Sequence, residues 1–187
     1  MRLNRSDGYM DGLGHASFYP AAGGFVEQES LAETPDDFVS FGTASGTTYI
    51  GLSWTPGSSY TITQIAPKLY KVLSAVQTLT AYIYSDALTV PDTVLATSTN
   101  TVDASTLSTD TTGVYTNFQF SGLALTGSTR YHLVIGCSSV DASNFVRIRY
   151  LTVGGGSEFL DLDADGTSWG ATTEATVQGT FKTYITA

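Results

Sequence analysis

Three closely spaced aspartates are the residues whose type and spacing point most clearly to chemistry. The run Asp161-Leu-Asp-Ala-Asp-Gly166 places a carboxylate at every second position and ends in glycine. The same spacing opens D-x-D-x-D-G calcium loops, in which carboxylate and carbonyl oxygens surround one ion. The twelfth position of such a loop should be a bidentate Glu, and here it is Thr172. Calcium bound by Asp161, Asp163 and Asp165 is therefore one interpretation.

The other interpretation of this run is a strand. Leu160 and Leu162 would then point inward, and Asp161 and Asp163 would face solvent. At a rise of about 3.3 Å per residue, alternate carboxylates on a strand lie about 7 Å apart, which is too far to share one ion.

Nucleophiles and zinc ligands are scarce. The chain has one cysteine, Cys137, and two histidines, His15 and His132, so it can form no internal disulfide and cannot supply a His/Cys zinc set. Alternation in 131–137 places Cys137 on the same face as Tyr131 and Ile135, which indicates a small buried apolar residue. No G-x-S-x-G motif is present. We therefore predict no catalytic residue and no enzyme; a hydrolase would need two carboxyl groups facing each other across a groove.

Aromatic side chains could form a platform for a glycan or a protein. The candidates are Trp169, Tyr82 and Tyr84, with Trp54 and Tyr115 as further members. The alternative is that the tryptophans pack in the core or under loops.

Two arginines, Arg147 and Arg149, share one face of a predicted strand. They could anchor an acidic partner or pair with local aspartates.

Composition indicates a β protein. The 187 residues include 29 Thr, 20 Ser, 19 Gly and 11 Tyr, and only 13% are charged. Thr and Tyr suit a pleated surface, and Gly suits turns. A net charge of −9 with 8 Lys and Arg argues against nucleic acid and anionic membrane surfaces. No run approaches the roughly 18 apolar residues of a membrane span, and no signal-peptide run is seen, so we expect the chain to be made and kept in the cytoplasm.

Hydrophobic periodicity divides the chain into two regions, residues 1–37 and residues 38–187. Residues 1–37 carry aromatics among glycines and prolines without a persistent period. They are predicted to form an extended arm that packs on the body or on a neighbouring subunit through Phe18, Tyr19 and Phe25; the alternative is a disordered N-terminus.

Residues 38–187 alternate with a period of two, with turn residues between the runs. They predict an all-β, antiparallel jelly-roll β-sandwich of about eight or nine strands. The clearest predicted strands are 47–54, 60–66, 78–84, 114–120, 129–136, 144–151, 157–163 and 175–186.

Several stretches together carry a family pattern. They include Val90-Pro-Asp-Thr-Val-Leu-Ala-Thr-Ser98, Phe118-Gln-Phe120, Leu125-Thr-Gly-Ser-Thr-Arg-Tyr-His-Leu-Val-Ile135 and Gly166-Thr-Ser-Trp169. In this order they resemble the choice-of-anchor jelly-roll modules of phage virion proteins and bacterial surface or secreted proteins. The family turn is Pro-Gly, whereas this chain has Pro91-Asp92.

The resemblance implies a binding or structural module without catalytic residues. Together with the arm and the absence of a signal peptide, it leads us to expect a virion accessory protein. Such a protein would be a capsid decoration, head-fibre or tail-associated subunit, bound to other virion proteins through its arm and self-associating, for example as a trimer. The alternative is a carbohydrate-binding module that contacts host-surface glycans.

Overall fold

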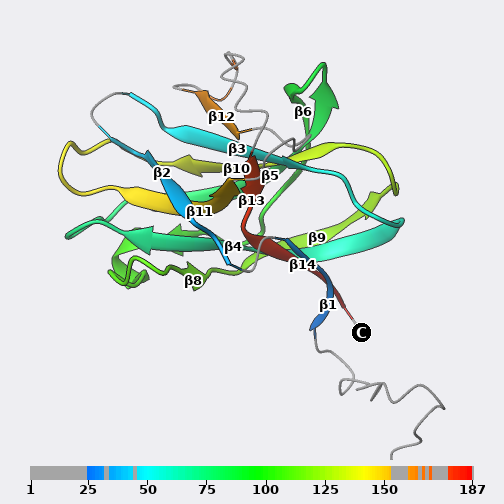
Figure 1. The fold of residues 1–187 in the computed structure, drawn as a ribbon, viewed down its shortest axis with the longest axis horizontal. Coiled ribbons are helices and arrows are strands. Elements are labelled where there is room, and N and C mark those ends of the chain that lie inside the picture. The colour runs from blue at the N-terminus through cyan, green and yellow to red at the C-terminus, as the bar shows by residue number, and fades with distance from the viewer. Residues whose placement is uncertain are drawn as a thin grey trace, which may run out of the picture.

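The fold is an antiparallel β-sandwich, as the sequence predicts (Figure 1). The computed structural model describes residues 25–31, 34–43, 46–152, 160–163, 166, 169 and 177–186. These residues form two packed sheets and one short 3-10 helix, Ala104–Thr106, and contain no α-helix.

The larger sheet has eight strands. They are β1 (Phe25–Leu31), β2 (Asp37–Phe41), β4 (Tyr60–Lys71), β8 (Val114–Tyr115), β9 (Phe118–Leu125), β11 (Val146–Thr152), β13 (Val177–Gly179) and β14 (Phe181–Thr186). The long strand β4 organises this sheet, because it pairs with β8, β9, β11 and β14.

The smaller sheet has six strands. They are β3 (Tyr49–Trp54), β5 (Thr78–Ala87), β6 (Val90–Thr97), β7 (Val102–Asp103), β10 (Tyr131–Cys137) and β12 (Leu160–Asp163). Its main path runs β12-β3-β10-β5-β6, so most neighbours are not consecutive in sequence and the chain crosses repeatedly between the sheets.

The core lies between the two sheets and follows the predicted alternation. Leu79, Ala81 and Ile83 of β5 point inward and are fully buried. Trp54 of β3 is also fully buried, and its ring contacts Phe181 of β14 edge to face at a centroid distance of 5.5 Å. Trp54 is therefore a core residue and is not available for a surface platform.

The described residues form 14 strands, which exceeds the predicted eight or nine, partly because two predicted strands divide. The predicted strand 114–120 is interrupted and forms β8 and β9, and the predicted strand 175–186 forms β13 and β14. Four further strands, β1, β2, β6 and β7, lie outside the predicted strand ranges.

Strand β1 connects the predicted arm to the sandwich. It pairs with β14 at an edge of the larger sheet, with Phe25 opposite Thr186. Glu29 strengthens this attachment, because its carboxylate accepts a hydrogen bond from the backbone N–H of Gly57 at 2.7 Å and another from the Tyr60 hydroxyl at 2.9 Å. Burial of the Tyr60 ring, together with its contact to Glu29, raises the pKa of the phenol. Part of the predicted arm thus packs on the body as an edge strand.

Candidate functional site

The outer face of the smaller sheet carries a row of four aromatic side chains. Tyr49 of β3, Tyr82 and Tyr84 of β5, and Trp169 follow one another with centroid distances of 6.4, 6.3 and 6.1 Å. Successive ring planes are inclined by 48°, 68° and 74°. The rings therefore pack tilted or edge to face and do not form one flat surface.

Two glycines make room for the first ring of this row. Tyr49 lies directly opposite Gly136 of β10, and a Cβ on Gly136 would be only 2.5 Å from Cε1 of the tyrosine ring. A Cβ on Gly166 would be 3.2 Å from the same carbon. Gly166, the last residue of the aspartate motif, has a φ of 76° and is buried. Gly166 thus lies on the outer face of the smaller sheet, beside the Tyr49 ring.

The structure brings together part of the predicted aromatic platform. Tyr82, Tyr84 and Trp169 belong to one row, and Tyr84 is only 7% exposed. Tyr115 belongs to the other sheet, where its ring lies near the ammonium group of Lys68. Sequence reasoning missed Tyr49. The signal was available: Tyr49 precedes the inward-facing Ile50 in the predicted strand 47–54, so alternation directs its ring to the outer face.

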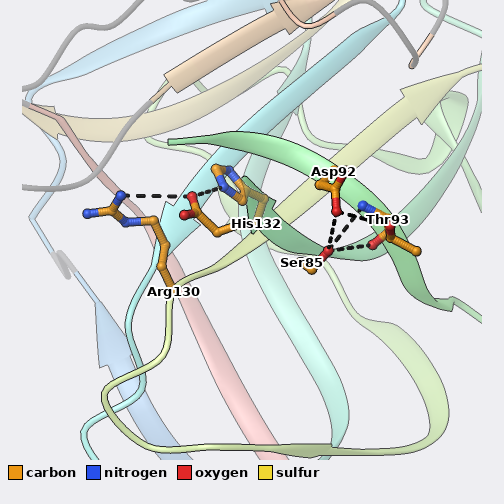
Figure 2. Close-up of polar contacts among 6 residues, drawn as sticks. Ser85, Asp92, Thr93, Arg130 and His132 are labelled. Atoms are coloured by element: carbon orange, nitrogen blue, oxygen red, sulfur yellow. Dashed lines mark hydrogen bonds and ion pairs between the residues drawn. The ribbon is translucent and has the colours of Figure 1, made fainter. Parts of the chain in front are cut away.

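A polar cluster lies at one end of the same face (Figure 2). His132 of β10 is fully buried, and its Nε2 is 2.8 Å from Oδ1 of Asp86. Asp86 lies two residues after Tyr84 on β5. Nη1 of Arg130 is 3.8 Å from the same oxygen. Asp86 was missed because its importance depends on the pairing of β5 with β10, which the alternation pattern does not specify.

A second set of polar contacts stabilises the hairpin of β5 and β6. The hydroxyl of Ser85 lies 3.3 Å from Oδ2 of Asp92, and it accepts a hydrogen bond from the backbone N–H of Thr93 at 3.1 Å. Figure 2 shows the Ser85 hydroxyl directed toward β6 rather than toward His132. Pro91-Asp92 was predicted to be a turn, but both residues lie in strand β6, and the hairpin turns at Leu88 and Thr89, where φ is positive. Asp92 stabilises the hairpin through its contact with Ser85.

The aspartate motif begins in strand β12. Asp161 is opposite Gly51 and Asp163 is opposite Tyr49 in the register with β3, as the strand interpretation predicts. The side chains of both residues, and the whole of Asp165, lie outside the described part of the chain. Among the described residues, no three His, Cys, Asp or Glu side chains are grouped closely enough to hold a metal ion. The calcium interpretation stays a prediction.

The predicted anchoring residues are described only in part. Phe25 is the first residue of β1 and is 43% exposed. Phe18 and Tyr19 lie outside the described residues.

Cys137 is buried at the end of β10. It is 8% exposed, belongs to the core cluster, and its thiol donates a hydrogen bond to the backbone carbonyl of Ser139 at 3.3 Å. Burial raises the pKa of the thiol to about 11, although hydrogen bonding opposes this shift. The thiolate that would act as a nucleophile is therefore scarce at neutral pH.

The comparisons leave the family open. No protein-family model matches the chain, and no curated protein sequence matches it either. Within the described residues, no helix is long and apolar enough to cross a membrane.

The raised thiol pKa predicts slow alkylation of Cys137. At pH 8 the folded protein should hold roughly one thiolate per thousand molecules, and this population should grow tenfold with each pH unit until the pH approaches the pKa of about 11. We expect iodoacetamide to modify native Cys137 much more slowly than the same residue in guanidinium, as measured by intact mass. Equal rates in the two conditions would contradict the buried, protonated thiol.

Proposed function

We propose that this protein is a non-enzymatic structural or accessory subunit of a phage virion, attached to the particle through its N-terminal segment. The capsid-decoration, head-fibre and tail-associated roles are all within this proposal. The resemblance to choice-of-anchor modules motivates it, and the position of β1 is the structural observation that supports it.

Strand β1 gives the N-terminal segment a defined place from which to reach a partner. Its first residue, Phe25, is opposite Thr186, so the first and last described residues of the chain lie side by side at one edge of the larger sheet. The ladder with β14, the contacts of Glu29, and an ion pair of 2.8 Å between Glu27 and Lys182 hold β1 on the body. A pull on the N-terminal segment would therefore be transmitted to the larger sheet.

The molecule also has two distinct sides. Figure 1 shows β1 and the C-terminal end on one side and the hairpin of β5 and β6 on the opposite side. The hairpin presents Leu88, which is 94% exposed, at its tip. An anchor on one side and a projecting hairpin on the other suit a subunit that is fixed to a particle and faces outward. Self-association, for example into a trimer, belongs to the same proposal.

Attachment can be tested by deleting residues 1–24 from the gene in the producing phage. Because the deletion stops before β1, the sandwich should still fold, which far-UV circular dichroism of the purified variant can check. We expect immunodetection to find the wild-type chain on purified particles and to lose the truncated chain. A scrambled segment with the same length and composition serves as the matched control and should also fail to attach.

Two results would count against this proposal in different ways. Normal attachment of the truncated chain would refute the role of the N-terminal segment. Absence of the wild-type chain from purified particles would refute the virion assignment itself.

A second candidate function is carbohydrate binding for adsorption to the host surface. The observation that favours it is the row of Tyr49, Tyr82, Tyr84 and Trp169, because aromatic rings stack on sugars. The inclined planes and the burial of Tyr84 leave little flat ring surface, so we rank this function second.

A glycan array separates the two candidates. If the protein is a structural subunit, the wild type should bind no glycan above background. Specific binding that is abolished in Trp169→Ala, with the fold retained, would reverse the ranking. Tyr115→Ala is the matched control, because this ring lies on the other sheet and its loss should leave any such binding unchanged.

A further inference from the structure

The outer face of the larger sheet gathers most of the positive charge in the body. Six Lys and Arg residues follow residue 24 in the sequence. Four of them lie on this face, at positions opposite the core-facing residues of their strands: Lys68, Arg147, Arg149 and Lys182. This concentration contrasts with the net charge of −9 for the whole chain. We call these four residues the cationic face.

Arg147 is held in place at one end of the cationic face. Its guanidinium carbon lies 4.0 Å from the centroid of the Phe38 ring, and Nε donates a hydrogen bond to the Ser40 hydroxyl at 3.0 Å. Nη1 is also 3.4 Å from the hydroxyl of Tyr70, which is opposite Arg147 in the register. The planar guanidinium is thus fixed before any partner arrives, so binding would cost little side-chain entropy.

Arg149 and Lys68 lie side by side in the middle of the cationic face. A Cβ on Gly113 would be 3.1 Å from Cγ of Arg149 and 3.2 Å from Cγ of Lys68, so the two stems flank this glycine. Arg149 donates one hydrogen bond from Nη2 to the backbone carbonyl of Pro35 at 3.0 Å. Its Nε is buried and meets no hydrogen-bond acceptor among the described residues.

Among the described residues, one of the four cations on this face forms an ion pair with a carboxylate. Glu27 pairs with Lys182 at 2.8 Å. In the described part of the chain, no carboxylate forms an ion pair with Lys68, Arg147 or Arg149. The sequence left open that Arg147 and Arg149 pair with local aspartates. No aspartate among the described residues forms such a pair. The Tyr115 ring lies 5.4 Å from the ammonium nitrogen of Lys68 and 5.1 Å from that of Lys182, which adds an aromatic surface between two cations.

We propose that the cationic face binds an acidic segment of a partner protein, with carboxylates seated on Arg147, Arg149 and Lys68. Guanidinium groups match the geometry of carboxylates, and the exposed edge of Phe38 beside Arg147 adds apolar contact area. An acidic segment with a small number of carboxylates matches the small number of cations on this face. A dense polyanion such as nucleic acid would instead be repelled by the acidic remainder of the chain. This binding goes beyond attachment through residues 1–24 and uses a different part of the molecule.

The test uses the full chain and a synthetic 12-residue peptide of alternating Glu and Ser as the probe, titrated by calorimetry at low ionic strength. Lys68→Gln should weaken binding about threefold and Arg147→Gln about tenfold, because the arginine offers a fixed fork of donors. Lys71→Gln is the matched control. It removes one charge from the same strand, but Lys71 donates to the backbone carbonyl of Ser105 and lies outside the cationic face.

Several outcomes would overturn the proposal. They are no binding by the wild type, an equal loss in Lys71→Gln and Lys68→Gln, and tighter binding of a 12-residue oligothymidylate through the same residues. Self-association of the wild type that disappears in Lys68→Gln, measured by light scattering, would instead identify a second copy of this chain as the occupant. Because the Lys68 side chain forms no hydrogen bond among the described residues, and Gln keeps the backbone bond to Thr180, this variant keeps the test valid even if Arg147→Gln does not fold.

Discussion

The packing of the Tyr49 ring over Gly136 is the contact on which the smaller sheet depends. All seven residues of β10 are buried, including His132 and Val134, which point away from the core. Such burial on both sides requires the outer face to be covered, and the Tyr49 ring can lie across β10 only because Gly136 has no side chain. Gly166 packs against the same ring and so adds to the cover on this face.

The two outer faces therefore differ in what they offer to a partner. On the smaller sheet, aromatic rings and a buried imidazole pack against one another, which stabilises the sandwich but leaves little free ring surface. On the larger sheet, cations and half-buried rings remain accessible, and β1 brings the N-terminal segment to the edge. The proposals for attachment and for acidic partners consequently both use the larger sheet, whereas the glycan alternative depends on the smaller one.

The sequence predicted the features that depend on local alternation. The inward positions of β5 and β10 and the burial of Cys137 follow from a period of two. The predicted turn at Pro91-Asp92 is wrong, because both residues lie in β6 and the hairpin turns at Leu88 and Thr89. The sequence did not predict the partners of these strands. The contact of His132 with Asp86 and the cationic face both require strands distant in sequence to lie side by side, and register of that kind is set by tertiary packing. Strand β1 was missed because its burial alternates only weakly at the edge of the sheet.

A double-mutant cycle between Gly136 and Tyr49 tests the covering of β10 most directly. Gly136→Ala should lower the free energy of unfolding in urea by about 2 kcal/mol, because the new methyl group overlaps the tyrosine ring. In the Tyr49→Ala background the same change should cost less than about 0.5 kcal/mol. Gly46→Ala is the control: Gly46 has a φ of 85° and no atom near its missing Cβ, so its cost should be the same in both backgrounds. Additive costs for Gly136 and Tyr49 would contradict the account.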